Sequence, residues 1–566
     1  MDDISIVLCG EAGQGIQTVE KLFTKIAKKA GYNVFSTKEY MSRVRGGSNS
    51  TQIRISTKPV AAYIDRIDIL IPLSEDAIDH VDKRISKSTL IIGEKKYVKT
   101  TKTDNKIEIP INQLAIDIGN VIYSNIIAVG LLSSLCNINK TILINIIGEY
   151  FKKKKRELVK NNIIAADKGY ETGIEIIKKD KINKNISPSN KSNDDIVLNG
   201  AEAISLGAIS GGCNFISSYP MSPSTGILTF LSNHSEEFNI IVEQAEDEIS
   251  AINMVLGAWY AGARGMVTTS GGGYALMTEG VSLAGMIESP VVIHLGQRPA
   301  PATGLPTRTE QGDLLHALYS SHGEFPKIIF APGTLQDGFY LTQKAFNLAD
   351  KYQVPVYILS DQYLIDSFYN ISKIELDEIN NKNYFIRTKK DYKRYSITKN
   401  GISPRGIPGY GDGLVCVDSD EHDEYGRITE NMDMRTEMVR KRLRKLSEIK
   451  RDIIPPELIG EKDYKILIIG WGSTYHIIRE ALENIGREDI SFLHFKQVFP
   501  LHDDTIEYLT RAEKTIIVEN NATSQFSKLI RQQTGYDIRY KILQYNGLPF
   551  SVETIKKEIL QNLKRG

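Results

Sequence analysis

The sequence predicts an α/β fold that contains several doubly wound domains. Short apolar runs of strand length alternate with helical patterns over most of the 566 residues. Alternation of this kind implies mostly parallel sheets that helices cover on both faces. Most of the runs end in loops rich in Gly, Pro, Ser or Thr, and polar loops at strand ends are where such sheets bind ligands. The length suits three or four domains, each with its own core.

Composition excludes several classes of protein. The formal net charge is +1, so no overall field attracts nucleic acid or an anionic membrane. The longest apolar runs are too short to span a bilayer. The N-terminus enters a strand-like run without a basic signal region, so we expect a cytoplasmic protein. The four cysteines, Cys9, Cys136, Cys213 and Cys416, are far apart and form no CxxC pair, so we expect neither an iron–sulfur cluster nor another metal site in this chain.

Residues 1–177 are predicted to form the first α/β domain. Its first strand is Ile4–Cys9, followed by Gly10-Glu-Ala-Gly-Gln-Gly-Ile16 and a helical pattern over Val19–Ala30. This order presents backbone N–H groups to an anion at a helix N-terminus, although a tight turn without a ligand explains it equally well. Further strands are expected at Ile69–Pro72 and Leu90–Ile92.

A polar linker and a second α/β domain follow. Residues 178–195 are dominated by Lys, Asn, Ser and Asp and have too little apolar content to pack, which predicts a linker. Residues 196–373 alternate again and include helical patterns over Asp247–Ala261 and Tyr274–Ile287. The expected strands are Asn214–Ser218, Ile240–Glu243, Gly265–Thr269, Val291–Leu295, Lys327–Ala331 and Val354–Leu359.

The C-terminal third divides into a connector and a last domain. Residues 374–460 are charged and rich in turn residues, so we expect an extended connector with one amphipathic helix near Met438–Lys450. Residues 461–566 are predicted to form the last α/β domain. Lys465-Ile-Leu-Ile-Ile-Gly-Trp-Gly-Ser473 contains its first strand, and a further strand is expected at Thr515–Val518.

Glu248 is the first candidate for chemistry, at the start of a predicted helix. A carboxylate there can be a surface residue that the helix dipole stabilises. A buried glutamate with a raised pKa would instead exchange a proton with a ligand ring. Glu243 and Glu246 are nearby alternatives.

Four blocks of the second domain carry a family resemblance. In order they contain Tyr-Pro-Met-Ser-Pro, Glu-Asp-Glu-Ile-Ser-Ala, Thr-Ser-Gly-Gly-Gly and Gln-Arg-Pro-Ala-Pro-Ala-Thr-Gly-Leu-Pro-Thr, between Phe215 and Thr307. This order resembles the α subunit of 2-oxoacid:ferredoxin oxidoreductases. Glu421-His-Asp-Glu-Tyr-Gly426 is similar to the 2-oxoglutarate synthase type. Gly10–Ile16 resembles the family's γ domain, here fused ahead of α.

The resemblance implies a fold for each domain and an activity. It makes residues 1–177 a γ-type domain, residues 196–373 the pyrimidine-binding domain of a thiamine diphosphate enzyme, and residues 461–566 a transketolase C-terminal-like domain. The implied activity is the coenzyme A-dependent oxidative decarboxylation of a 2-oxoacid, best matched by 2-oxoglutarate to succinyl-CoA, with ferredoxin as the electron acceptor. Thiamine diphosphate is the electron sink in such chemistry.

The resemblance also assigns residues around the cofactor. The matching glutamate of the family contacts the aminopyrimidine ring and promotes its imino tautomer, a role that we carry over to Glu248 as the catalytic residue. Pro220, Ser270 and Gly271 match positions that bind the cofactor.

A second set of residues matches positions that bind the substrates. Tyr219, Ser222, Arg298 and Thr303 correspond to residues that hold the 2-oxoacid. An arginine fork binds a carboxylate bidentately, although a surface arginine in a Pro-rich loop is the alternative. Ser222 stands where the family usually has threonine and lacks its methyl group. Three basic residues lie before or beside the glycine pair at 46–47, namely Lys38, Arg43 and Arg45. They are candidate contacts for substrate or coenzyme A, although a solvated basic loop is an equally good interpretation.

A separate β subunit is expected to supply Mg²⁺, the diphosphate site and a [4Fe-4S] cluster. Gly411-Asp-Gly413 has the letters of a diphosphate motif, but the turn-rich Ile407-Pro-Gly-Tyr410 precedes it where a strand is needed, and acidic turns follow where a helix is needed. Asp420–Glu424 is interpreted as a solvated acidic loop or subunit contact, not as a metal site. The expected partners are the β subunit and ferredoxin, in a dimer of αβ units, without nucleic acid or membrane.

Two alternatives stay open. The substrate could be pyruvate or another 2-oxoacid, because a side-chain carboxylate such as that of 2-oxoglutarate needs a second cation. The chain could also be a non-catalytic nucleotide-binding or scaffold protein with doubly wound domains.

Overall fold

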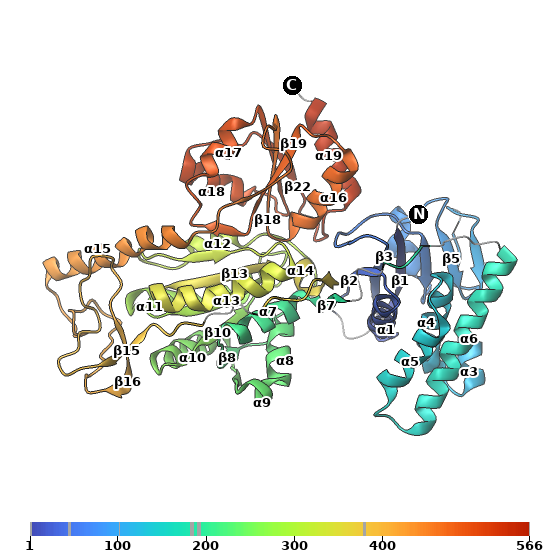
Figure 1. The fold of residues 1–566 in the computed structure, drawn as a ribbon, viewed down its shortest axis with the longest axis horizontal. Helices are drawn as coiled ribbons and strands as arrows, with labels where there is room; N and C mark the ends of the chain where they lie inside the picture. The colour runs from blue at the N-terminus through green and yellow to red at the C-terminus, as the bar shows by residue number, and fades with distance from the viewer. Residues whose placement is uncertain are drawn as a thin grey trace. The chain divides into compact units, whose positions relative to one another are not determined.

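The computed structural model describes residues 3–42, 47–100, 102–180, 186–189, 194–376 and 381–564. The chain divides into two compact units (Figure 1). Unit 1 comprises Met1–Leu198, Asp366–Lys373 and Ser551–Glu553, and unit 2 comprises Asn199–Ile365, Ile374–Phe550 and Thr554–Gly566. The finer boundaries that the sequence suggests, at 177, 195, 373 and 460, stay predictions. Within the described ranges, no helix is both long and apolar enough to cross a membrane.

Unit 1 is built on an eight-stranded mixed sheet in the order β6-β5-β4-β1-β3-β2-β14-β7. Strand β1 pairs in parallel with β4 and antiparallel with β3. Strand β14 comes from much later in the chain than its neighbours. The strands are β1 (Asp3–Glu11), β2 (Asn33–Glu39), β3 (Ser48–Ser56), β4 (Ile69–Pro72), β5 (Leu90–Gly93), β6 (Lys106–Glu108), β7 (Ile196–Asn199) and β14 (Phe368–Ile371).

Helices of unit 1 pack closely where glycine allows it. The longest helix, α6, runs through the first residues of the expected linker, and residues 181–185 and 190–193 of that linker lie outside the described ranges. Helix α6 packs against α4, and a Cβ atom on Gly169 would lie 2.0 Å from the carbonyl oxygen of Ile127. Only glycine permits this approach. The helices are α1 (Ile16–Lys29), α2 (Ala77–Val81), α3 (Ile111–Ile118), α4 (Ser124–Leu135), α5 (Lys140–Phe151) and α6 (Arg156–Asp180).

Unit 2 contains a central seven-stranded sheet in the order β20-β12-β13-β11-β10-β8-β9. All neighbouring pairs are parallel except β12–β20, which is antiparallel. The six strands expected from the sequence are present within two residues of their predicted ends. The strands are β8 (Phe215–Ser218), β9 (Ile241–Gln244), β10 (Gly265–Thr269), β11 (Val291–Gln297), β12 (Ile328–Phe330), β13 (Pro355–Asp361) and β20 (Gln497–Phe499).

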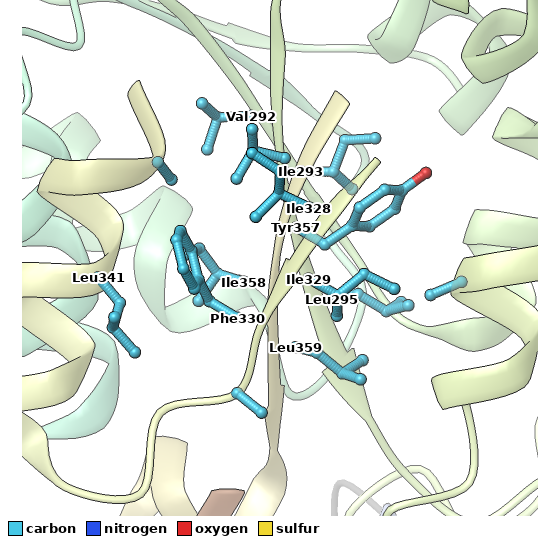
Figure 2. Close-up of a cluster of buried hydrophobic side chains, with 14 of the residues drawn as sticks. Val292, Ile293, Leu295, Ile328, Ile329, Phe330, Leu341, Tyr357, Ile358 and Leu359 are labelled. Carbon is cyan, nitrogen blue, oxygen red and sulfur yellow. The ribbon is translucent and has the colours of Figure 1, made fainter. Parts of the chain in front are cut away.

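Helices bury this central sheet. Every residue of β10, β11 and β13 is buried, as expected for parallel strands that helices cover on both faces. Figure 2 shows the apolar side chains on both sides of the strands, from Val292 of β11 to Leu359 of β13. The helices of this part are α7 (Gly200–Ser210), α8 (Thr225–Asn233), α9 (Ser235–Phe238), α10 (Glu248–Tyr260), α11 (Gly271–Met286), α12 (Leu314–Tyr319), α13 (Leu335–Tyr352) and α14 (Gln362–Asp366).

The C-terminal part of unit 2 forms a five-stranded sheet in the order β17-β19-β18-β21-β22. Figure 1 shows α17 and α18 on one face of this sheet and α16 and α19 on the other. The strands are β17 (Glu457–Ile459), β18 (Ile466–Trp471), β19 (Ile490–Phe495), β21 (Lys514–Glu519) and β22 (Tyr540–Leu543). The helices are α16 (Tyr475–Ile485), α17 (Thr505–Arg511), α18 (Gln525–Thr534) and α19 (Val552–Lys564).

The segment between the two sheets of unit 2 contains β15 (Phe385–Thr388), β16 (Arg405–Gly411) and α15 (Met432–Ile449). Helix α15 begins earlier than the basic pattern predicts, because the side chain of Asn431 accepts a hydrogen bond from the N–H of Met434 and so caps the helix at that point.

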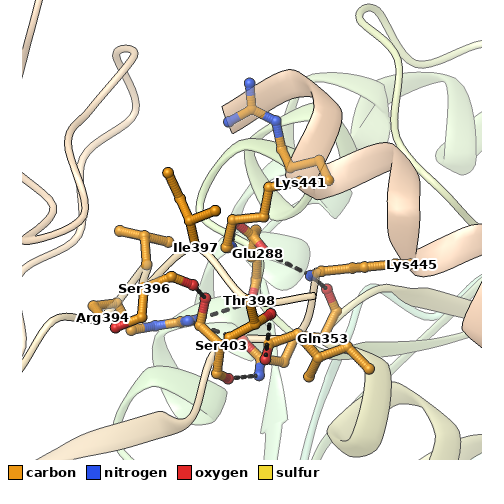
Figure 3. Close-up of polar contacts among 12 residues, drawn as sticks. Glu288, Gln353, Arg394, Ser396, Ile397, Thr398, Ser403, Lys441 and Lys445 are labelled. Carbon is orange, nitrogen blue, oxygen red and sulfur yellow. Dashed lines mark hydrogen bonds and ion pairs between the residues drawn. The ribbon is translucent and has the colours of Figure 1, made fainter. Parts of the chain in front are cut away.

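A buried polar cluster holds α15 against the central part of unit 2 (Figure 3). The Nζ atoms of Lys441 and Lys445 each lie 2.6 Å from a carboxylate oxygen of Glu288, and all three side chains are at most 2% exposed. Arg394 donates to Oε1 of Gln353 and to the carbonyl oxygen of Glu288. Burial of charge requires such complete pairing, so this cluster fixes the segment in one position.

Candidate active site

Four neighbouring strands bring the four sequence blocks to one edge of the central sheet. Strands β9, β8, β10 and β11 are adjacent and parallel. They end at Gln244, Ser218, Thr269 and Gln297, and each block continues from one of these ends. The carboxyl edge of an open parallel sheet is the usual place for a ligand, which makes this edge the candidate site.

Glu248 is buried at this edge, as the first residue of α10. Its side chain is 3% exposed, whereas Glu243 and Glu246 are exposed. Asp247 caps the helix by accepting a hydrogen bond from the N–H of Ser250 at 2.7 Å. Oε1 of Glu248 has no hydrogen-bond partner among the described residues, and burial raises the pKa of the carboxyl group. Of the three neighbouring glutamates, only Glu248 has the burial that proton exchange with a ligand ring requires.

The carboxyl group of Glu248 lies on the first turn of α11. A Cβ atom on Gly273 would lie 2.3 Å from Oε1 of Glu248 and 2.3 Å from Oγ1 of Thr269. The helix begins at Gly271, not near Tyr274 as the sequence suggested, so the three glycines form a helical turn and not a loop. Ser270 precedes this turn, fully buried, and its Oγ has no hydrogen-bond partner in the described part of the chain.

Arg298 follows β11 and lies largely within the protein. Its exposed fraction is 9%, which does not fit the alternative of a surface arginine. Nη1 donates a hydrogen bond to the carbonyl oxygen of Ser222 at 2.7 Å, so the structure brings these two predicted residues together. Burial lowers the pKa of the guanidinium group, while the negative charge of Asp313 opposes that effect.

The remaining predicted residues differ in their surroundings. Tyr219 is 42% exposed and Thr303 is also exposed, while Pro220 is half-buried. Lys38 belongs to β2 of unit 1, where its Nζ lies 3.5 Å from a carboxylate oxygen of Asp366. Arg43 and Arg45 lie outside the described residues.

Asp313 is a residue of this site that the sequence analysis missed. It precedes α12 and is 5% exposed, and a Cβ atom on Gly271 would lie 2.5 Å from its Oδ1. Burial, assisted by the charge of Glu310 and opposed by that of Arg298, raises the pKa of Asp313 to about 7. Its only signal in the sequence is an acidic residue before an apolar helix start, which normally indicates a helix cap.

The buried polar atoms of the site fit a polar ring ligand. Oε1 of Glu248 and Oγ of Ser270 are both buried without a partner among the described residues, and unsatisfied groups of this kind are uncommon in native interiors. Both flank the first turn of α11, in which only Gly272 has open space beside it: a Cβ atom there would lie 3.8 Å from the nearest atom, the carbonyl oxygen of Ala302. The arrangement fits a cofactor that presents ring nitrogens to a carboxyl group.

A cavity of about 410 Å³ lies at the glycine turn of unit 1. Helix α1 begins at Ile16, directly after Gly15, which has a φ of 77°. This φ favours glycine, and a Cβ atom on Gly15 would lie 2.1 Å from Nδ2 of Asn125, so that side chain would have to move. Polar side chains that line the cavity include Gln14, Glu94, Asn112 and Asn125. The cavity favours the ligand-binding interpretation of this turn over the turn without a ligand.

Strand β16 leads directly into Gly411-Asp-Gly413. The expectation that a turn-rich segment precedes this motif is wrong, because Ile407–Tyr410 lies within β16. Between Asp412 and α15 no helix occurs, so the motif still lacks the helix that a diphosphate site needs.

The acidic loop nearby is held by basic side chains. Glu421 pairs with Arg442 at 2.9 Å and also with Arg435, and Glu424 pairs with Lys393 at 2.9 Å. The buried ring of His422 lies 3.9 Å from that of Tyr395, between centroids. In the part of the chain that the structure describes, no cluster of His, Cys, Asp or Glu could hold a metal ion.

Comparisons with known proteins place the chain in a family. A family model described as pyruvate flavodoxin/ferredoxin oxidoreductase, thiamine diphosphate-binding, matches residues 206–441, and one described as pyruvate ferredoxin/flavodoxin oxidoreductase matches residues 5–172. The 2-oxoacid:ferredoxin oxidoreductase subunit alpha of a Sulfolobus species is 31% identical over all of this chain and 97% of its own length. The chain belongs to the family of 2-oxoacid:ferredoxin oxidoreductase α subunits.

The chain is also similar to proteins whose names specify 2-oxoglutarate. The 2-oxoglutarate synthase subunit KorA of Archaeoglobus fulgidus is 32% identical over 58% of this chain and 88% of its own. A solved 2-oxoglutarate:ferredoxin oxidoreductase from Magnetococcus marinus, with 2-oxoglutarate, coenzyme A and succinyl-CoA bound, superposes with a TM-score of 0.93 at 30% identity and covers both chains completely.

These findings confirm three of the predictions from sequence. The family, the α/β fold class with a thiamine diphosphate-binding domain, and the oxidoreductase class are as expected. They favour an enzyme over the alternative of a non-catalytic nucleotide-binding or scaffold protein. Because its relatives are named α subunits, the family implies a partner subunit.

Proposed function

We propose that this chain supplies half of the active site of an enzyme that converts 2-oxoglutarate and coenzyme A into succinyl-CoA and CO₂, with the two electrons passing to ferredoxin. The observation that carries the proposal is the buried Glu248 carboxyl group, with one unpaired oxygen, on the glycine turn of α11.

Glu248 is the proposed catalytic residue. Thiamine diphosphate supplies, when bound, a nucleophilic carbon and an electron sink for decarboxylation. Glu248 would hold or release a proton at Oε1 toward the aminopyrimidine ring. Burial favours this role because it raises the pKa of the carboxyl group toward the working pH. Pro220, Ser270 and Gly271 are proposed to bind the same cofactor, with Oγ of Ser270 available as a buried hydrogen-bonding group.

Arg298 is proposed to bind the carboxylate next to the reacting carbonyl group of the substrate. Its low exposure strengthens charge pairing, and its bond to Ser222 fixes the direction of the guanidinium group. Tyr219 and Thr303 would complete this pocket, and their exposure leaves both accessible to a ligand.

The choice of 2-oxoglutarate rests on the relatives. Proteins named 2-oxoglutarate synthase or oxidoreductase subunit KorA match this chain in three organisms, Archaeoglobus fulgidus, Methanocaldococcus jannaschii and Mycobacterium tuberculosis, and the structural match carries 2-oxoglutarate and coenzyme A. The second carboxylate of 2-oxoglutarate needs a further cation, for which Lys38, Arg43 and Arg45 are the candidates. The same three residues and the cavity of unit 1 are candidates for binding coenzyme A.

A β subunit is proposed to complete the enzyme in a dimer of αβ units. It would hold Mg²⁺, the diphosphate of the cofactor and a [4Fe-4S] cluster. The cysteines of this chain support that division. Cys9, Cys136 and Cys213 are each buried, and among the described residues no group of three or more His, Cys, Asp or Glu side chains could hold a metal ion.

The test is anaerobic co-purification with the β subunit and reduction of a low-potential dye in the presence of coenzyme A. Preference for 2-oxoglutarate in a panel of 2-oxoacids supports the proposal, and preference for pyruvate corrects the substrate only. Glu248→Gln should lower kcat by about 10²- to 10⁴-fold, while the exposed Glu246→Gln should retain activity. Equal activity of the two variants would remove Glu248 as the catalytic residue.

A further inference from the structure

Two buried carboxyl groups contact the first turn of α11 from different sides. Oε1 of Glu248 lies 2.3 Å from where a Cβ atom of Gly273 would stand, and Oδ1 of Asp313 lies 2.5 Å from where that of Gly271 would stand. Side chains two positions apart on a helix point in nearly opposite directions, so the turn lies between the two carboxyl groups. The proposed function assigns a role to Glu248 and none to Asp313.

A helix cap does not account for Asp313. Although it directly precedes α12, its side chain makes no capping hydrogen bond to that helix. Its Oδ2 is buried and has no hydrogen-bond partner among the described residues. Its backbone N–H donates at 3.0 Å to Oε1 of Gln297, the residue next to Arg298. The backbone of the loop is therefore attached to the end of β11, while Oδ2 of the Asp313 carboxyl group stays unpaired among the described residues.

Asp313 lies beside the end of β11 that Arg298 follows, because its N–H is bonded to Gln297, the last residue of that strand. The negative charge of Asp313 supports the positive charge of Arg298, and that positive charge opposes the rise in the pKa of Asp313. An ionised Asp313 would therefore compete with a substrate carboxylate for Arg298. A protonated Asp313 removes that competition and leaves a neutral hydrogen-bonding group beside the turn.

We propose that Asp313 is a positioning residue that must be protonated for Arg298 to bind the substrate carboxylate. The inference rests on the proposed function, in which Arg298 receives that carboxylate. It assigns to this site a second proton, separate from the proton on Glu248, that controls substrate binding and not the chemical step.

The proposal predicts that KM for the 2-oxoacid depends on pH. With a pKa of about 7 for Asp313, about one tenth of the carboxyl groups are ionised at pH 6 and about nine tenths at pH 8. KM should therefore rise about tenfold between these pH values. Besides Arg298, the charged group that acts on the titration of Asp313 is Glu310 of the same loop. His316 of α12 lies nearby and its pKa is lowered by burial, but its charge does not contribute to the pKa of Asp313.

Three substitutions in the αβ complex separate Asp313 from its neighbours. Asp313→Asn keeps a neutral group of the same shape, so KM should stay low and should no longer change with pH. Glu310→Gln removes a charge that raises the pKa of Asp313, so the rise in KM should move to lower pH. His316→Gln should leave the wild-type profile unchanged.

The outcomes distinguish this inference from the proposed function. An Arg298→Met variant with unchanged KM would contradict the role of Arg298 itself. Two results would contradict the role of Asp313 alone. In the first, Arg298→Met raises KM but Asp313→Asn keeps the wild-type pH profile. In the second, the KM of the wild-type complex does not change with pH. If Asp313→Asn does not assemble, judged by thermal unfolding and co-purification, the wild-type and Glu310→Gln profiles still decide, because a purely structural Asp313 would not shift the midpoint.

Discussion

The substitution Gly273→Ala tests the contact between α11 and Glu248 directly. The new Cβ atom would lie 2.3 Å from Oε1 of Glu248 and from Oγ1 of Thr269, so the carboxylate must retreat by about 1 Å to reach an ordinary contact. Both oxygens belong to side chains that can rotate, and alanine favours a helix over glycine by roughly 1 kcal/mol. The protein should therefore fold with little change in thermal stability.

The catalytic rate of Gly273→Ala, unlike its thermal stability, should fall strongly. A displacement of about 1 Å in a reacting group can lower a rate by about 10²-fold, so kcat for 2-oxoglutarate-dependent dye reduction by the αβ complex should fall by about two orders of magnitude. Gly272→Ala is the matched control, because the nearest atom to its new Cβ is the carbonyl oxygen of Ala302 at 3.8 Å. Equal activity of the two variants, with equal melting temperatures, would show that the missing side chain at Gly273 is not what keeps the carboxyl group of Glu248 in its active position.

Other expectations follow from the buried charges and thiols. Glu288→Gln leaves Lys441 and Lys445 without their carboxylate and should lower the free energy of unfolding by roughly 3–5 kcal/mol, measured by urea denaturation. Burial alone would raise the pKa of Glu288, but Lys445 and Lys441 hold it below its usual 4.5. The stabilisation should therefore be complete above about pH 4.5 and decrease as the pH falls further, a dependence that Glu288→Gln should lack. Cys9 and Cys213 should resist alkylation in the native chain at pH 8, because the pKa of each thiol is about 12; rapid labelling of either would contradict their burial. The isolated chain should not reduce dye with any 2-oxoacid, and turnover by the pure chain would contradict the need for a β subunit.

The central strands β10, β11 and β13 were predictable because they are buried runs rich in apolar residues. Strand β10 has the same bounds in the structure as in the prediction, Gly265–Thr269. The start of α11 was not predictable in that way, because three successive glycines disfavour a helix. Glycine is favoured at Gly271 and Gly273 because a Cβ atom would lie 2.5 Å from Oδ1 of Asp313 at the first position and 2.3 Å from Oε1 of Glu248 at the second.

The candidate site was predictable as a set of loops but not as a set of contacts. Sequence order and the family resemblance pointed to Glu248 and Arg298, yet their burial depends on contacts with Gly273 and Ser222, which lie far away along the chain. The pattern gave no reason to single out Asp313, since acidic residues before helices usually cap them. Strand β16 was missed because Pro408 and Gly409 are rare within strands.

Strand β20 has a consequence for the synthesis of the chain. It pairs Phe499 with Ile329 and so covers the outer edge of β12, in a sheet whose first strand begins at Phe215. Until residue 499 has left the ribosome, that edge presents unpaired backbone groups, which readily pair with other chains. A chain that is truncated or stalled before β20 should therefore aggregate, and dividing the gene upstream of β20 should not give an independently soluble catalytic domain.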